Sequence, residues 1–340
     1  MDVDKNHIAI GLMLLGLTVG FLAVRYFRAA PRRRLGFMGW LGLGIILGAE
    51  ILLASRTPAV MLYFTPIVWT GYLLLVHALV RSLDIPSSTN LRNPQDVQPD
   101  LKWLALWSVP LWLIFEAYNL RLQNWTYVGL PISPLAAGIG YIWAFSTIWP
   151  AIFLTADLLR ALGLFSSPAA PRGRWKRSTL MVIFLGGLAY LLVPVLVPVR
   201  AGSYLFGFVW IGFALLLDPL NYLWEGRSLL GEWEAGERST LVRFLAAGWV
   251  CGILWEFWNY WAGAKWLYVF PIMQNWKIFE MPILGYVGFL PFAVECFAMY
   301  EFVLVVGRKL GVSSKVVDEC RASGSRFEVP DAGGEGPPDA

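Results

Sequence analysis

The sequence contains few of the residues on which most enzyme active sites depend. Of its 340 residues, two are histidines, His7 and His77, and only 15% are charged. A histidine-rich iron or zinc site is therefore excluded. The three cysteines, Cys251, Cys296 and Cys320, form neither a CxxC metal-binding pair nor a disulfide framework.

Several catalytic motifs are also missing from the sequence. It has no Gly-rich phosphate loop, no GxSxG elbow, no HExxH pair and no DDxxD pair. These absences argue against nucleotide-driven transport, serine hydrolysis, zinc proteolysis and metal-dependent prenyl transfer.

Apolar residues are abundant. Hydrophobic residues make up 57% of the chain, and the mean hydropathy is +0.58. Stretches of about 20 apolar residues, each long enough to cross a hydrocarbon core of about 30 Å as a helix, recur along the sequence. We predict an all-α integral membrane protein with about nine transmembrane helices. They are expected at residues 8–27, 35–54, 60–80, 102–120, 134–158, 179–199, 203–222, 240–260 and 281–306.

The basic residues predict an orientation. Nine spans leave two alternating sets of loops and ends, and 21 of the 27 Lys and Arg residues fall in one set, against 6 in the other. Because basic loops stay in the cytoplasm, the N-terminus is expected outside and the C-terminus in the cytoplasm. The basic stretches RAAPRRR and PRGRWKR border spans on the cytoplasmic side, where contact with anionic lipid explains them. Membrane lipid is thus an expected partner, and nucleic acid is not.

Two stretches of the sequence match each other. FEAYNLRLQNWTY, from Phe115, aligns with WEFWNYWAGAKWLY, from Trp255. The matched pairs are Glu116 with Glu256, Asn119 with Asn259, Trp125 with Trp266, and Tyr127 with Tyr268. WTGYLLLVHAL likewise matches WIGFALLLDPL, and GYIWAF matches GYVGFL. The nearly constant offset predicts two tandem four-helix repeats in parallel orientation, related by a pseudo-twofold axis along the membrane normal.

The repeat divides the chain into four parts. Residues 1–30 form an N-terminal transmembrane helix, residues 31–165 the first four-helix repeat and residues 175–310 the second. Residues 311–340 are polar and rich in Gly and Pro, so they predict a disordered cytoplasmic tail.

Glutamates inside predicted spans are the candidate functional groups, because an ionised carboxylate in a bilayer needs water or a partner. Glu116 with Asn119, and Glu256 with Asn259, share one helix face each. Either the glutamates reach water while the asparagines bond the emerging loops, or the two carboxylates converge on a cavity roofed by Trp and Tyr.

Glu295 is the deepest of the predicted membrane carboxylates. It follows Pro291, which kinks a helix and frees a backbone carbonyl. From that depth a short acidic side chain reaches water with difficulty. We predict that Glu295 holds a proton for donation and opens onto a chamber between the two repeats; the alternative is a structural hydrogen bond between helices.

A helix ending in a polar residue, a W-x-Y external loop and a helix carrying Pro291 and then Glu295 resemble two carotenoid enzyme families. These are the membrane-integral lycopene cyclases and the related carotenoid 1,2-hydratases of archaea and some bacteria. The cyclases carry Pro-x-Glu-Glu or Pro-x-Glu-Asp, whereas this chain has a longer spacing and one carboxylate.

The resemblance implies acid-catalysed cyclisation or hydration of a polyene or other isoprenoid lipid in a bacterial or archaeal cell membrane, with no metal and no cofactor. Glu295 would protonate a double bond, and Glu116 or Glu256 would accept a proton or position water. Aromatic rings would stabilise the carbocation. The expected substrate-binding residues are Asn119, Trp125, Tyr127, Trp255, Trp258, Asn259, Trp266, Tyr268 and Tyr286.

Two other functions fit the same sequence. A small-molecule or lipid transporter, or a lipid-binding membrane protein without catalysis, would also use repeat halves around a central acidic site. A structural subunit of a larger membrane complex is the third possibility. The sequence does not specify an oligomeric state.

Overall fold

The computed structural model describes residues 5–29, 33–83, 100–166 and 170–312. The predicted tail lies almost entirely outside these residues. Most of the described residues are helical, and the described part also contains two short two-stranded sheets. The helices are α1 (Lys5–Arg28), α2 (Phe37–Ala54), α3 (Pro58–Ser82), α4 (Leu101–Leu122), α5 (Pro134–Ser146), α6 (Ile148–Ala161), α7 (Arg177–Leu196), α8 (Val199–Gly202), α9 (Phe206–Leu223), α10 (Leu229–Glu234), α11 (Ser239–Trp261) and α12 (Gly285–Lys309). The strands are β1 (Trp125–Val128), β2 (Lys265–Tyr268), β3 (Lys277–Ile278) and β4 (Met281–Pro282).

Eight helices in the described residues are long and apolar enough to cross a membrane, counting α5 and α6 as one. The others are α1, α2, α3, α7, α9, α11 and α12. This confirms the prediction of a multi-pass, all-α membrane protein. The predicted span at residues 102–120 forms helix α4, but α4 is not among the eight. Its last two turns carry Glu116, Asn119 and Arg121, which lower its hydropathy.

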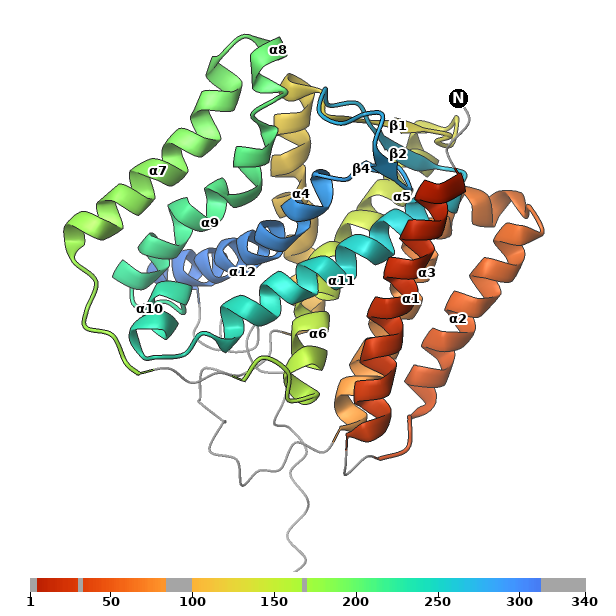
Figure 1. Cartoon of the computed structure of the whole chain (residues 1–340), viewed down its shortest axis with the longest axis horizontal. Helices are drawn as coiled ribbons and strands as arrows, with labels where there is room; N and C mark the ends of the chain where they lie inside the picture. Colours follow the sequence, from red (N-terminus) through yellow and green to blue (C-terminus); the bar gives the residue numbers. More distant parts are fainter. Residues whose placement is uncertain (1–4, 30–32, 84–99, 167–169, 313–340) are drawn as a thin grey trace, which may run out of the picture.

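The helices are arranged around a buried centre. In Figure 1, α1, α2 and α3 lie on one side and α7 to α10 on the other, with α4, α6, α11 and α12 between them. Strands β1 and β2 lie at one end, which we call the ribbon end, and the N-terminus lies there too. Most of α6 and most of the inner part of α12 are buried, whereas few residues of α1, α2 and α7 are buried.

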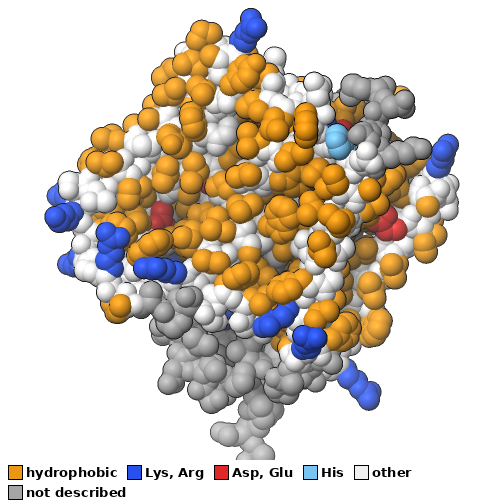
Figure 2. Space-filling model, in the orientation of Figure 1, with side chains coloured by type: hydrophobic (Ala, Val, Ile, Leu, Met, Phe, Trp, Pro, Cys, Tyr) orange, Lys and Arg blue, Asp and Glu red, His pale blue; other side chains and the backbone are white. Residues whose placement is uncertain are grey.

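The surface fits a lipid environment. Figure 2 shows hydrophobic side chains across the broad middle of one face, while most of the Lys and Arg visible there lie along its lower edges. Large apolar side chains such as Phe27, Phe37 and Leu120 are exposed. A soluble protein rarely exposes so continuous an apolar surface, which is the surface a bilayer covers.

Small residues let neighbouring helices approach each other closely. A Cβ atom added at Gly248 of α11 would lie 2.2 Å from the Phe289 carbonyl oxygen of α12. At Gly42 of α2 it would lie 2.5 Å from the carbonyl oxygen of Gly71 in α3. Such contacts are typical of helix packing in membranes, where helices associate through close packing rather than through the hydrophobic effect.

Candidate functional site

The two W-x-Y segments, which the sequence suggested were external loops, form one antiparallel ribbon. Strand β1 pairs with β2, so Trp125 lies opposite Tyr268 and Tyr127 opposite Trp266. Alternate residues of a strand point to opposite faces. Trp125 and Tyr127 therefore face the protein interior, while Thr126 is exposed on the outer face.

The matched asparagines hold the ends of this ribbon. The Asn119 amide nitrogen donates to the Trp125 carbonyl oxygen at 2.9 Å, and its side-chain oxygen accepts from the Trp125 backbone N–H at 3.0 Å. Asn259 makes the same two bonds with Trp266, again at 2.9 and 3.0 Å. Both asparagines therefore fix the chain where it leaves a helix, as the structural alternative predicted. Neither of them lines the cavity described next.

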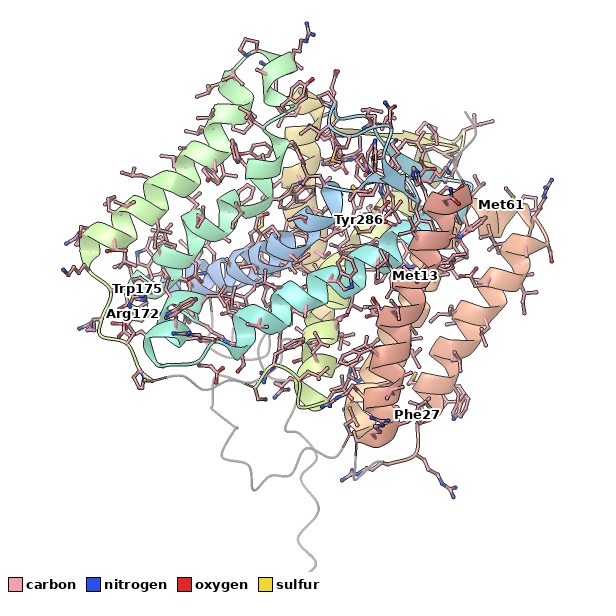
Figure 3. The ribbon with its side chains drawn as sticks, in the orientation of Figure 1. Met13, Phe27, Met61, Arg172, Trp175 and Tyr286 are labelled. Carbon is pink, nitrogen blue, oxygen red and sulfur yellow. The ribbon has the colours of Figure 1, made fainter. Side chains whose placement is uncertain are left out.

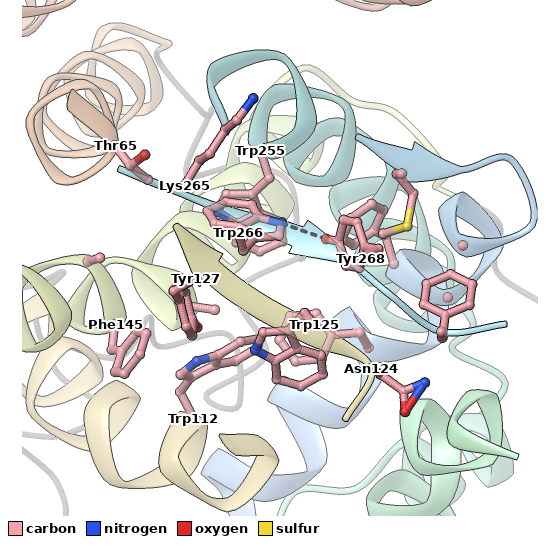
Figure 4. A pocket seen from close by; sticks show the side chains of 18 of the residues that line it. Thr65, Trp112, Asn124, Trp125, Tyr127, Phe145, Trp255, Lys265, Trp266 and Tyr268 are labelled. Carbon is pink, nitrogen blue, oxygen red and sulfur yellow. Dashed lines mark hydrogen bonds between the residues drawn. The ribbon is translucent and has the colours of Figure 1, made fainter. Parts of the chain in front are cut away.

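Beneath the ribbon lies a cavity of about 440 Å³, bounded by residues from both halves of the chain. This volume is within the range of small-molecule sites, about 300 to 1,000 Å³. Figure 4 shows aromatic rings from several elements gathered around it. Five predicted binding residues line the cavity, namely Trp125, Tyr127, Trp255, Trp266 and Tyr268. The cavity is also lined by five residues that were not predicted to bind a ligand, namely Trp112, Trp210, Phe289, Phe292 and Lys265.

Glu116 lies behind one wall of the cavity. Its Oε1 atom accepts hydrogen bonds from Trp112 Nε1 at 2.9 Å, Trp125 Nε1 at 3.3 Å and the Tyr127 hydroxyl at 2.5 Å. All three donors line the cavity, whereas Glu116 does not. The side chain is half-buried. The carboxylate thus reaches the cavity only through these aromatic donors.

Glu256 takes the matching place behind the opposite wall, with fewer donors. Its Oε1 atom accepts from the Tyr268 hydroxyl at 2.8 Å, and the Tyr268 oxygen accepts from Trp266 Nε1 at 2.8 Å. Figure 4 draws the bond between Trp266 and Tyr268. Glu256 is fully buried, at 0% exposure, and within the described residues its Oε2 atom has no hydrogen-bond partner.

The phenols of Tyr127 and Tyr268 belong to the ribbon, outside the spans. Burial raises the pKa of the Tyr268 phenol well above its ordinary value, and the Glu256 carboxylate adds to the rise. Burial and Glu116 raise the pKa of Tyr127 in the same way. Both hydroxyls therefore keep their protons at neutral pH and act as hydrogen-bond donors to the carboxylates.

Glu295 does not open onto this cavity, contrary to the prediction. It is fully buried, and its Oε1 atom accepts the backbone N–H of Phe213 in α9 at 2.8 Å. The cause is Phe292, which lines the cavity one helical turn earlier on α12. The Phe292 ring packs against Trp112 at 5.8 Å and Trp255 at 6.1 Å between ring centroids. This aromatic floor separates Glu295 from the cavity.

Two other predicted binding residues also lie elsewhere. Trp258 Nε1 donates to Glu50 of α2 at 3.0 Å, so this side chain links α11 to the first half of the chain. The Tyr286 hydroxyl donates to the Ile278 carbonyl oxygen at 3.0 Å, in a smaller cluster that α1 covers. Figure 3 shows Tyr286 where α12 begins, with Met13 of α1 on the same side of the molecule.

The missed residues left partial signals in the sequence. Trp112 precedes Glu116 by four residues, the spacing of neighbours on one helix face. Trp210 begins the second copy of the matched WTGY and WIGF segments, and Phe292 directly follows Pro291. The sequence does not predict the direction in which each ring points.

Lys265 is the one charged residue among those that line the cavity. Its Nζ atom forms a salt bridge with Glu280 Oε1 at 2.6 Å and donates to the Tyr260 carbonyl oxygen at 3.1 Å. Figure 4 shows its side chain extending away from the ring cluster. The interior of the cavity is therefore aromatic and nearly free of charge. In the described part of the chain, no group of three or more His, Cys, Asp or Glu could hold a metal ion.

Comparisons with known proteins found no matching family model, no matching curated protein and no matching solved structure.

Proposed function

We propose that this protein is a membrane-embedded enzyme that performs acid-catalysed cyclisation or hydration of a polyene or other isoprenoid lipid. One observation carries the proposal: an aromatic cavity lies between the tyrosines of two hydrogen-bonded pairs, Glu116 with Tyr127 and Glu256 with Tyr268. An apolar ligand suits such walls. The two pairs provide groups that can give and take a proton.

The Glu256 pair is the better candidate for the acid. Its contact with Tyr268 joins two oxygen atoms at 2.8 Å, with the phenol as donor to the carboxylate. When Glu256 is protonated, this hydrogen bond reverses, so the carboxyl proton moves to the phenol oxygen while the phenol proton, turned toward the cavity, goes to a ligand carbon. Protonation of a terminal double bond leaves a tertiary carbocation. Ring closure and proton loss complete a cyclisation, whereas capture of water and proton loss complete a hydration.

The walls of the cavity suit that cation. Indole and phenyl faces attract positive charge, more strongly where water is excluded. Trp112, Trp210, Trp255 and Phe292 line the space and offer such ring faces to a cation. The Glu116 pair, on the opposite wall, would accept the released proton or position water. In this proposal Glu295 has a structural role, because its hydrogen bond with the backbone of α9 joins α12 to that helix.

The same proposal includes two parallel repeats with α4 as a ninth span. Three observations support the repeats: the equivalent asparagine bonds, the ribbon register centred on Thr126 and Leu267, and matched ring contacts. Trp69 lies 5.2 Å from Trp255, and the matched Trp210 lies 5.5 Å from Phe115. A stripe of exposed leucines along α4 supports its contact with lipid, namely Leu106, Leu113 and Leu120. The basic loops support a cytoplasmic C-terminus, which places the ribbon end outside.

Expression in a lycopene-producing host tests the proposal. Pigment chromatography should give a new cyclised or hydroxylated carotenoid with the natural chain. Tyr268→Phe should reduce that product by about 100-fold, the scale of lost general acid catalysis. Tyr190→Phe is the control, because Tyr190 packs against Phe208 away from the cavity. An unchanged pigment profile with well-expressed natural chain would end the enzyme proposal.

A second candidate is a lipid-binding or transport protein without catalysis. It is favoured by the position of both carboxylates behind the cavity wall instead of on it. Unchanged lycopene that co-purifies with the natural chain and with Tyr268→Phe alike would support this candidate over the enzyme.

A further inference from the structure

The two sides of the cavity differ in how well they are closed. On each side, a helix of one half meets the last helix of the same half: α3 meets α5, and α9 packs against α12. The sequence repeat matches Tyr63 of α3 with Tyr204, and Trp143 of α5 with Gly288 of α12. The matched positions can therefore be compared directly.

On the first side, a tyrosine closes the wall. The Tyr63 hydroxyl donates to the Ala136 carbonyl oxygen at 3.0 Å, and its ring stacks on Trp143 at 6.4 Å between centroids. A Cβ atom added at Gly140 would lie 3.3 Å from the Tyr63 ring. Trp143 is itself fixed, because its Nε1 atom donates to Thr70 at 2.9 Å. The gap between α3 and α5 is thus filled.

On the second side, the matching contact between a tyrosine and a tryptophan is missing, although Trp210 of α9 packs beside Gly288, where an added Cβ atom would lie 3.4 Å from the Trp210 ring. Glycine replaces the stacking tryptophan at Gly288, and Tyr204 is 51% exposed. Within the described residues, the Tyr204 hydroxyl has no hydrogen bond. Gly207 lines the cavity, is exposed, and would have nothing within 4 Å of an added Cβ atom. The cavity is therefore open to the surface beside Gly207, in the first turn of α9.

The residues around this opening are apolar and partly exposed. Leu284 and Val287 line the cavity and are 52% and 61% exposed. Gly207 and Val287 are the second and third residues of α9 and α12, both of which are long and apolar enough to span a membrane. The opening is therefore at the depth where a bilayer begins. The ribbon, whose outer face exposes Thr126, covers the cavity from the end of the molecule.

We propose that the gap between the first turns of α9 and α12 is a lateral portal through which an isoprenoid ligand enters the cavity from the membrane leaflet at the ribbon end. This inference rests on the proposed function and adds a route and a source to it. The ligand is a lipid-dissolved molecule, because Leu284 and Val287 beside the opening are apolar and most of the side chains that line the cavity are aromatic or aliphatic. The first side has lost the equivalent portal through the stacking of Tyr63 on Trp143.

Loading kinetics test the portal. Purified full-length protein is reconstituted into phosphatidylcholine vesicles and mixed with donor vesicles that carry all-trans-retinol, an isoprenoid polyene. At intervals the vesicles are dissolved in detergent, free retinol is removed by gel filtration, and the retinol retained per protein is measured by absorbance. Gly207→Leu should load at least about tenfold more slowly than the natural chain, since the side chain obstructs entry, and should reach the same final occupancy.

Two further variants keep the result interpretable. Gly186→Leu on α7 is the matched control, because an added Cβ there also meets nothing within 4 Å and the site is far from the cavity lining. It should load at the natural rate. Val287→Trp fills the opening from an exposed position, so it tests the portal if Gly207→Leu does not fold.

Each outcome separates the two proposals. Natural loading rates in both Gly207→Leu and Val287→Trp, with retinol bound, would refute the portal and leave the proposed function standing. A natural chain that retains no retinol would refute isoprenoid binding and the portal with it. Equal slowing in Gly186→Leu would show a general effect of added bulk and would also refute the portal.

Discussion

The two glutamate–tyrosine pairs differ although their sequence motifs match. Glu116 is half-buried and accepts three hydrogen bonds on one oxygen. Glu256 is fully buried, accepts the Tyr268 hydroxyl on one oxygen and leaves its other oxygen without a partner in the described structure. Several donors stabilise a fixed negative charge, and a buried carboxyl with one donor is suited to exchange a proton. The two copies of the motif therefore place their glutamates in different environments.

The largest expected effect separates the two tyrosines. Tyr268→Phe removes the hydroxyl that donates to Glu256, so product formation should fall by about 100-fold, within the range of general acid catalysis. Tyr127→Phe should lower it by less than about tenfold, because Glu116 keeps Trp112 and Trp125. Product per folded protein in the lycopene-producing host measures both. Equal losses would mean that the two pairs have equivalent roles.

The next largest effect concerns how closely helices pack at Gly248 and at Ser108, two positions that the sequence repeat matches. Gly248→Ala should destabilise the protein by about 2 to 3 kcal/mol, because the added methyl would overlap the Phe289 carbonyl oxygen. At the matched position, Ser108 donates to the Phe145 carbonyl oxygen and accepts from the Trp149 N–H. Ser108→Ala should cost about 1 kcal/mol, the worth of a hydrogen bond. Urea unfolding in detergent measures both, and a larger loss for Ser108→Ala would contradict the close crossing.

A smaller effect comes from alkaline pH. Folding raises the pKa of Tyr268, so the folded chain holds this proton more tightly than the unfolded chain does. That contribution to stability is complete below the ordinary tyrosine pKa of about 10 and is lost as pH rises above it. The melting temperature should therefore fall between about pH 9 and pH 11. The fall should be shallower in Tyr268→Phe, and an identical pH profile would contradict the burial of this phenol.

The smallest effect concerns the closed side of the cavity. Trp143→Gly copies the residue that the second half has at Gly288, and it removes the stacking partner of Tyr63. Retinol loading should become about two- to threefold faster, since a second route opens at modest cost in packing. A rate below that of the natural chain would mean that Trp143 guides the ligand.

The sequence predicted the helices well because their signal is local. Stretches such as 37–54 and 239–261 need only length and apolarity to be recognised, and the repeat was visible as matched letters. The candidate site was predicted in part. Trp255 and Trp266 line the cavity, while Glu295 lies beneath its floor. Which way a side chain on α12 points depends on Phe292 and its neighbours, and that is a property of packing between distant segments.

The pairing of β1 with β2 was missed for a related reason. Four-residue strands are too short for periodicity to reveal them, and the partners are about 140 residues apart in the sequence. From the sequence, Trp125, Thr126 and Tyr127 were predicted to lie in an aromatic external loop, not in a strand. The two asparagines, however, fix the residues at both ends of the ribbon, and this determines which residues of β1 and β2 pair.

Photolabelling tests the central claim most directly, namely that the aromatic cavity is the site of an isoprenoid ligand. A diazirine-bearing isoprenoid hydrocarbon is photolysed with the reconstituted protein, and labelled residues are identified by mass spectrometry. We predict labels on Trp112, Trp255 and Phe292 that unlabelled retinol removes by competition. Labels confined to outward-facing residues such as Leu106 and Leu120, unaffected by retinol, would contradict the account.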